Sequence, residues 1–139
     1  MSNQKTILYL VTQPELGGAQ IYVSFLAKRM LSKGWEVHIA TGPGAAGEWL
    51  EQVEKQGATV HRLVNVIREL SPVKDFLSLL ELVSLFKKTQ PDIVHLNSSK
   101  AGVTGSLAVK MAKVQGVVYT AHGFVFNEPL SQWKKKLYV

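Results

Sequence analysis

The chain has 139 residues, a formal net charge of +6 and no cysteine. This length fits one domain with a sizeable core, and the lack of cysteine excludes a disulfide framework and a thiolate metal site. The positive charge favours anionic partners such as nucleotides, phospholipid headgroups or nucleic acid, although a plain solvated surface explains such scattered charge equally well.

The first apolar run, residues 5–12, is short and rich in β-forming residues. No small-residue cleavage site follows it, so we expect a buried strand and not a signal peptide. No apolar run in the chain approaches the roughly 18 residues that a membrane span needs. The sequence therefore predicts a protein that is soluble or peripheral to a membrane.

Along the chain, strand-like apolar runs alternate with segments of helical periodicity. Gly34 follows the first helical segment as a C-terminal stop, and Ser71-Pro72 predicts an N-cap followed by proline at the first helical position. The predicted strands cover residues 5–12, 35–41, 58–63, 92–96 and 117–121, and the predicted helices cover residues 19–32, 46–56, 73–89 and 101–115. This βαβαβαβαβ order predicts an α/β fold with a Rossmann-like, doubly wound parallel sheet.

Two of the helical segments suggest surroundings beyond the domain itself. The segment 73–89 is leucine-rich nearly all round, so we expect it to be covered on two sides. A last helix, predicted from about residue 131, reaches the final residue without a cap or a following strand. We therefore expect the fold to be truncated at its C-terminus and the chain to be part of a longer protein.

The most informative stretch runs from Asp92 to Phe126 and contains a strand, a crossover helix and a second strand. The handed crossover places the carboxyl ends of both strands on one edge of the sheet, where open parallel sheets bind ligands. The crossover helix is rich in small residues, which predicts close packing on the sheet, and we expect Gly116 to end it. The polar residues predicted at this edge are Ser98, Ser99, Lys100, His122 and Gly123.

Gly17 and Gly18 follow the first strand and open a helix. Glycine there lets backbone N–H groups approach a phosphate at the positive end of the helix. The dinucleotide fingerprint needs G-x-G-x-x-G and an acidic residue at the end of the second strand, which here ends in Thr41-Gly42, so we do not expect NAD binding. A glycine turn that is required by geometry alone is the alternative.

His122 can hydrogen-bond a sugar hydroxyl, steady a phosphate or act as a base near neutral pH. A structural role is the alternative, because His38, His61 and His95 all lie in or beside predicted strands. The four histidines are scattered along the sequence, so we expect no metal site.

The serines and the lysine after the fourth strand form neither a G-x-S-x-G elbow nor a G-K-[ST] phosphate loop. Their functional interpretation is polar anchoring of a ligand. The alternative is an N-cap at Ser98 or Ser99 beside a solvated Lys100. Farther on, residues 134–136 are three lysines beside Trp133, which could touch anionic lipid or form a solvated helix face.

Three stretches carry a resemblance to a known family: LGGAQIYVSFLAKRMLSKGWEVHIATG, SPVKD and PDIVHLNSSKAGVTGSLAVKMAKVQGVVYTAHGFVF. Together they resemble the N-terminal, acceptor-side domain of family 4 glycosyltransferases of the GT-B fold, of the bacterial surface-polysaccharide type. The resemblance implies transfer of a sugar from a nucleotide-sugar donor to a saccharide or lipid-linked acceptor. It also implies retention at the anomeric carbon, with no metal or other cofactor.

By the same resemblance, residues 1–139 are part of the N-terminal Rossmann-like domain of a two-domain cytoplasmic enzyme. The C-terminal domain, which holds most of the nucleotide-sugar and carries an E-x7-E segment, is absent, so this part should be inactive by itself. Such an enzyme is expected to be cytoplasmic, with peripheral contact to the inner face of an anionic membrane and no nucleic-acid partner. The alternative is a non-catalytic Rossmann-like module that binds a nucleotide or polyanion.

The resemblance also assigns the site residues. Gly17 and Gly18 match the glycine loop that approaches the donor phosphates. Ser99 and Lys100 match the S-S-K-A-G turn, while His122, followed by Gly123, matches the catalytic histidine of the T-x-H-G-F segment. Asn97 departs from the pattern, since many relatives carry a second histidine there.

Overall fold

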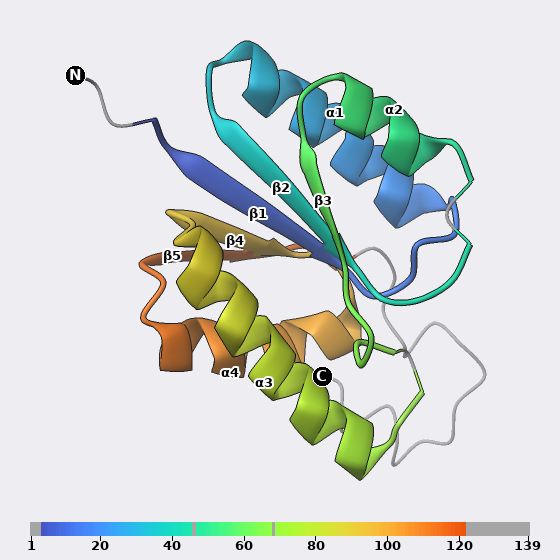
Figure 1. Cartoon of the computed structure of the whole chain (residues 1–139), viewed down its shortest axis with the longest axis vertical. Coiled ribbons are helices and arrows are strands. Elements are labelled where there is room, and N and C mark those ends of the chain that lie inside the picture. Colours follow the sequence, from blue (N-terminus) through green and yellow to red (C-terminus); the bar gives the residue numbers. More distant parts are fainter. Residues whose placement is uncertain (1–3, 46, 68, 122–139) are drawn as a thin grey trace.

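A computed structural model describes residues 4–45, 47–67 and 69–121 (Figure 1). Within these residues, strands and helices alternate strictly, as the apolar periodicity predicts. In chain order they are β1 (Thr6–Val11), α1 (Gly18–Ser32), β2 (Glu36–Thr41), α2 (Trp49–Lys55), β3 (Thr59–Arg62), α3 (Pro72–Thr89), β4 (Ile93–Leu96), α4 (Ser99–Ala112) and β5 (Gly116–Tyr119).

The strands form one all-parallel sheet in the order β3-β2-β1-β4-β5. The chain therefore starts in the middle of the sheet, moves outward to β3, and then crosses over to β4 and β5. Figure 1 shows the result: α1 and α2 cover one face of the sheet, and α3 and α4 cover the other. The predicted doubly wound, Rossmann-like fold is confirmed, and its switch point lies between β1 and β4.

Strand β1 is buried along its whole length because it is the central strand. Its side chains alternate between two cores, as strand geometry requires. Leu8 and Leu10 belong to the core under α3 and α4, while Ile7, Tyr9 and Val11 belong to the core under α1 and α2.

Helix α4 packs closely on the sheet, as its small residues predict. A Cβ atom added to Gly102 would stand 2.8 Å from the Tyr119 ring, and one added to Gly105 would stand closer still to the Leu96 side chain. Both distances are below the 3.0 Å under which real Cβ contacts essentially never fall. Glycine at these positions therefore lets α4 lie close to these two side chains, which would have to shift to admit a Cβ atom.

The prediction that Gly116 ends the crossover helix was wrong. The helix ends at Ala112, and Lys113 caps it in the left-handed conformation with φ of 60°. Gly116 instead begins β5, where a Cβ would stand 3.0 Å from the Asp92 carbonyl oxygen on the neighbouring chain segment. Its small size serves strand pairing rather than helix termination.

The predicted N-cap at Ser71 is confirmed, since its hydroxyl accepts the Lys74 N–H.

Within the described residues, helix α3 is buried on one face only, and not on two as its composition predicts. Its buried residues lie on one face, and four large apolar side chains on the opposite face are exposed. These exposed side chains are Val73, Phe76, Leu77 and Leu80.

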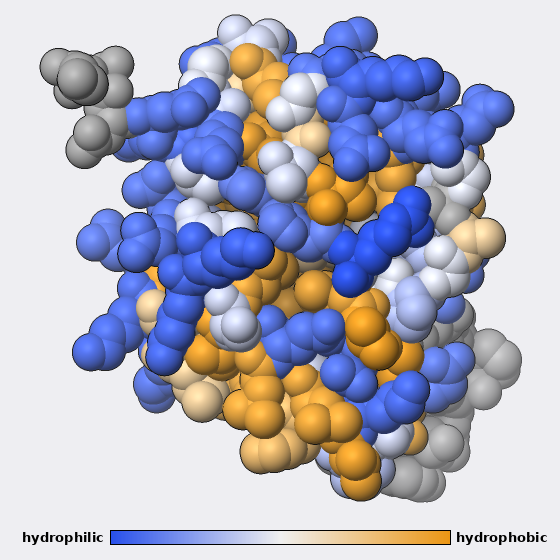
Figure 2. Space-filling model, viewed as in Figure 1, coloured by the Kyte–Doolittle hydropathy of each residue, from blue (hydrophilic) through white to orange (hydrophobic). Residues whose placement is uncertain are grey.

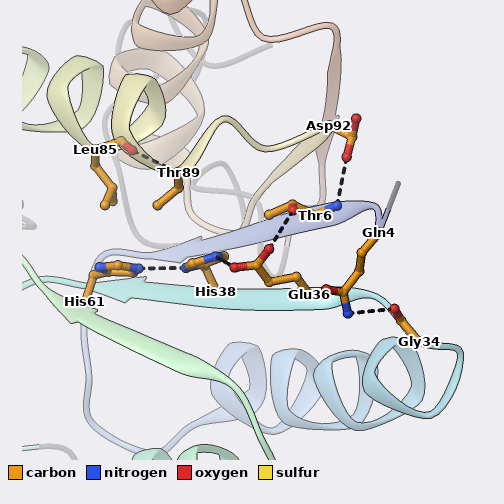
Figure 3. A network of polar contacts seen from close by, with 9 residues as sticks. All are labelled: Gln4, Thr6, Gly34, Glu36, His38, His61, Leu85, Thr89 and Asp92. Atoms are coloured by element: carbon orange, nitrogen blue, oxygen red, sulfur yellow. Dashed lines mark hydrogen bonds and ion pairs between the residues drawn. The ribbon is translucent and has the colours of Figure 1, made fainter. Parts of the chain in front are cut away.

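Two histidines that are far apart in the sequence form one polar network (Figure 3). His38 Nδ1 and His61 Nε2 lie 2.8 Å apart and the rings stack, while His38 Nε2 lies 3.0 Å from a carboxylate oxygen of Glu36. Thr6 Oγ1 donates to the other carboxylate oxygen. Burial, together with His38 and Lys88, lowers the pKa of His61. The described residues contain no group of three or more side chains that could hold a metal ion.

Candidate functional site

The loops after β1, β2 and β3 meet at the carboxyl edge of the sheet. Gly42, in the loop after β2, lies between the loop after β1 and the loop after β3. Its N–H donates to the Thr12 carbonyl oxygen at 3.0 Å. A Cβ at this position would stand 2.6 Å from that same oxygen and closer still to the Val66 carbonyl oxygen. Only glycine fits between these two backbone segments without a shift of the backbone, so this part of the edge is tightly packed.

Two buried side chains donate hydrogen bonds to the loop that follows β1. The buried Trp49 indole donates to the Pro14 carbonyl oxygen at 2.6 Å, and the buried Gln20 amide donates to the Gln13 carbonyl oxygen at 2.7 Å. The sequence interpretation assigned no such role to either residue. The sequence signal was a polar Gln20 in the first turn of α1, on the same face as the buried Val23 and Ala27. Contacts across the fold leave no such local pattern.

Gly17 and Gly18 stand at the N-terminus of α1, Gly17 as its N-cap and Gly18 as its first residue. Neither has positive φ, and a Cβ added to Gly18 would meet no atom within 4 Å. A Cβ on Gly17 would stand 3.1 Å from the Gln20 side-chain oxygen. Among the residues described, no side chain caps this helix and no acidic residue lies in its first turn. The turn geometry therefore does not require glycine at residue 18, and open space lies beside it.

Ser98 is the N-cap of α4, which is one of the alternatives that the sequence left open. Its hydroxyl accepts the Ala101 N–H at 3.1 Å and is also hydrogen-bonded to the Thr12 hydroxyl. This contact joins the ends of β1 and β4 across the switch point. Ser99 is the first residue of α4 and is partly exposed at that edge.

Lys100 is not the solvated lysine that the alternative interpretation expects. Its ammonium lies 2.7 Å from Asp75 Oδ1 as an ion pair and also donates to the Glu69 carbonyl oxygen. These partners hold Lys100 toward the N-terminus of α3, whereas Gly18 opens α1 on the opposite face of the sheet. An anionic ligand at the edge would have to compete with Asp75 for this charge.

His122 and Gly123 lie outside the described residues, as do Trp133 and the three lysines after it. The chain leading toward them is well anchored. The Thr120 N–H donates to the Leu96 carbonyl oxygen at 2.9 Å, and the Thr120 hydroxyl lies 2.7 Å from Nε2 of the buried His95. The His95 ring packs against Tyr9, whose pKa is raised to about 12 by burial and by Tyr22.

The Asn97 side chain is buried at the end of β4. It is only 1% exposed, and its side-chain amide donates to the His95 carbonyl oxygen at 3.0 Å. Its backbone N–H donates to the Leu10 carbonyl oxygen. The backbone N–H of Asn97 therefore helps to join the end of β4 to the central strand, whereas its side chain bonds within β4.

A doubly wound sheet whose loops converge at a switch point defines a Rossmann-like domain. The family model described as "Glycosyl transferase 4-like domain" matches residues 17–139. The chain belongs to this family, and the resemblance found in the sequence is confirmed.

The relatives agree with this assignment. The chain is 44% identical over 71 residues to an Escherichia coli protein named UDP-Gal:alpha-D-GlcNAc-diphosphoundecaprenol alpha-1,3-galactosyltransferase, a match that covers 51% of the chain and 18% of the relative. It is 25% identical to the capsular polysaccharide biosynthesis glycosyltransferase CapM of Staphylococcus aureus over 88% of the chain and 30% of the relative. The crystal structure of a glycosyltransferase from Rickettsia africae matches with a TM-score of 0.72 and 21% identity, over 99% of the chain and 34% of that structure.

The match thus spans about a third or less of the length of each of these three proteins. Among its described helices, none is both long enough and apolar enough to cross a bilayer.

Proposed function

We propose that the chain is the N-terminal, acceptor-side domain of a retaining glycosyltransferase of the two-domain GT-B type. The enzyme would move a sugar from a nucleotide-sugar donor to a saccharide or lipid-linked acceptor. Family membership supports this proposal, as do relatives named for galactosyl transfer to a diphosphoundecaprenol-linked sugar and for capsular polysaccharide biosynthesis. The observation that carries it is the open position at Gly18, where the fold itself does not need glycine.

In this mechanism the bond between the anomeric carbon and the donor diphosphate breaks, and the nucleoside diphosphate leaves. An acceptor hydroxyl oxygen bonds to the anomeric carbon on the same face of the sugar, and the hydroxyl proton passes to the leaving diphosphate. The protein contributes positioning and electrostatic stabilisation of the leaving diphosphate. Backbone N–H groups at Gly17 and Gly18 approach the diphosphate, since the space beside Gly18 is open. The enzyme needs no metal or other cofactor, and the nucleotide-sugar is a substrate.

The remaining predicted residues take supporting roles. His122 is the catalytic residue that orients the transferred sugar, and Gly123 lets the backbone approach it. Ser99 anchors a ligand hydroxyl. Lys100 contributes positive charge, but only after a diphosphate displaces Asp75 from its ammonium.

The 139-residue chain by itself would be inactive, because most of the donor site belongs to a C-terminal domain that would form the other wall of the cleft. We place the complete enzyme in the cytoplasm, at the inner face of the membrane, where a lipid-linked acceptor is found.

The test uses the longer protein that carries this chain, with UDP-galactose as donor and a GlcNAc-diphosphate-polyprenol as acceptor. Other UDP-sugars are then assayed in turn. We expect Gly18→Val to raise the donor KM at least about tenfold, since a side chain would displace the diphosphate from the helix N-terminus. His122→Ala should lower kcat at least about a hundredfold. Both variants should melt within a few degrees of the parent.

Gly18→Ser is the matched control for size, because it adds a small side chain and should have an intermediate effect on the donor KM. Full activity of Gly18→Val and His122→Ala would refute the assigned roles. Binding of UDP without any sugar transfer by the longer protein would favour the alternative, a non-catalytic nucleotide-binding module.

A further inference from the structure

His95 contacts side chains from three different parts of the fold. It lies in β4, is only 7% exposed, and its Nε2 atom lies 2.7 Å from the hydroxyl oxygen of Thr120, directly after β5. The centroid of its ring lies 5.4 Å from that of Tyr9 in β1 and 6.0 Å from that of Tyr22 in α1. Aromatic rings attract each other at such distances, and the Tyr22 ring meets the imidazole edge-on. His95 therefore joins β1, α1 and the end of β5.

These contacts lie on the α1 side of the sheet. Tyr9 belongs to the core under α1 and α2, and Tyr22 packs against that core. The exposed apolar side chains of α3 lie on the opposite side of the sheet, and Figure 2 shows them as a broad orange area in the lower half of the molecule. A substitution of His95 should therefore leave that surface unchanged, and its effects concern the side of the sheet on which α1 lies.

Packing alone does not explain a histidine at this position. Its neighbours in β4, Val94 and Leu96, are buried and apolar. Burying a ring with polar nitrogen atoms costs free energy unless those atoms form hydrogen bonds. The hydrogen bond to Thr120 supplies a reason for an imidazole where an apolar side chain would otherwise be favoured.

Thr120 determines how the chain leaves β5. This strand lies at the edge of the sheet and three of its four residues are exposed, so packing holds its end weakly. Two hydrogen bonds fix Thr120, because its N–H donates to the Leu96 carbonyl oxygen at 2.9 Å and its hydroxyl pairs with His95. The first bond orients the backbone and the second orients the side chain. In the sequence, His122 follows two residues later.

The Tyr22 contact connects this arrangement to the N-terminus of α1. Gly18 is the first residue of that helix, and Tyr22 comes four residues later, one turn along the same side. Because the Tyr22 ring packs against His95, the first turns of α1 and the chain that leads to His122 are held by the same imidazole.

We propose that His95 is a positioning residue of the sugar transfer, which acts through Thr120 on His122. The inference rests on the proposed function, in which His122 orients the transferred sugar and the backbone at Gly18 approaches the diphosphate. The hydrogen bond sets the direction of the chain before His122, and the ring contacts set that direction relative to α1. Such positioning matters because a displacement of about 1 Å can lower the rate of a reaction about a hundredfold.

The test compares substitutions of Thr120 in the longer protein that carries this chain. Thr120→Val removes the hydroxyl with little change of shape, and we expect kcat to fall at least about tenfold while the donor KM changes by less than about twofold. Thr120→Ser keeps the hydroxyl and should bring kcat to within about threefold of the parent value. In a protein that already carries His122→Ala, Thr120→Val should lower kcat no further, because the two residues act as a unit.

A matched pair of histidine variants tests the other partner of the hydrogen bond. His95→Phe keeps an aromatic ring and removes its nitrogen atoms, so it should lower kcat as Thr120→Val does, and the two changes together should cost no more than either alone. His38→Phe is the control, because His38 is also a strand residue that is 7% exposed, but its partners are His61 and Glu36. It should lower Tm and leave kcat unchanged.

A second measurement does not depend on activity. The chain has four histidines, so NMR can follow the ring signal of each one. Thr120→Val should shift the signal of His122 and leave those of His38 and His61 in place. An unchanged His122 signal, or an equal loss of kcat with and without His122→Ala, would overturn the positioning role even where His122→Ala alone supports the proposed function. Full activity of His122→Ala would instead refute the catalytic role of His122, and this inference with it.

Discussion

Replacing Gly42 by alanine tests how tightly the carboxyl edge of the sheet is packed. The new Cβ would stand 2.6 Å from the Thr12 carbonyl oxygen and closer still to that of Val66. Both obstacles are backbone atoms, so neither can rotate away as a side chain does. The two loops must therefore separate, and the hydrogen bond from the Gly42 N–H to Thr12 would be strained.

The cost can be worked out from these contacts. Overpacking usually costs about 1–3 kcal/mol, and two backbone contacts place Gly42→Ala at the upper end of this range. Loss of the hydrogen bond adds about 1 kcal/mol. We therefore expect the free energy of unfolding to fall by about 3–4 kcal/mol and Tm by about 10–15 °C.

The assay is urea and thermal unfolding of the 139-residue chain, followed by circular dichroism. The control is Gly18→Ala, the same chemical change at a glycine that has no neighbour within 4 Å of the added Cβ. It should leave stability unchanged or raise it by up to about 1 kcal/mol. If Gly42→Ala melts within 3 °C of Gly18→Ala, a difference far below the estimate of about 10 °C, the edge is looser than its contacts indicate.

Two further predictions concern charged groups. Asp75→Asn removes the carboxylate that pairs with Lys100, and because this pair is partly exposed we expect urea titration to show a loss of no more than about 1 kcal/mol; a loss of about 3 kcal/mol would indicate a buried pair instead. The lowered pKa of His61 means that unfolding takes up a proton below the ordinary pKa of 6.5, so stability should fall as pH drops below that value. His61→Gln should lose less stability than the parent between pH 7.5 and 5.5, and equal losses would contradict this account.

The order of the elements could be predicted because the spacing of apolar residues and the runs of β-branched residues can be recognised within a short stretch of sequence. Ser71-Pro72 gave the start of α3 correctly for the same reason, since an N-cap and the proline after it act within one turn. Gly116 misled the prediction because glycine ends helices and also permits close strands. The close approach of the Asp92 carbonyl oxygen distinguishes the two roles of glycine here, and Asp92 comes before the helix that precedes Gly116.

Contacts between residues that are far apart in the sequence limit how much of the site can be predicted. Thr12 and Ser98 are 86 positions apart, yet their hydroxyls join the two strands of the switch point. The partner of Lys100 comes from α3, which no motif around Lys100 reveals. The sequence could therefore indicate which edge carries the candidate site residues, but not which polar groups at that edge are already engaged.

Gly42 and Gly18 show why a glycine must be interpreted through its neighbours. At Gly42 the packing of the domain explains the need for glycine, because two carbonyl oxygens occupy the space that a Cβ would need. At Gly18 the same space is empty, the backbone conformation suits any residue, and a helix N-terminus faces outward. Alanine would favour the helix there by up to about 1 kcal/mol. A position that forgoes this gain without an internal reason is most simply explained by something that approaches from outside, and a diphosphate on the first turn of α1 requires such an opening.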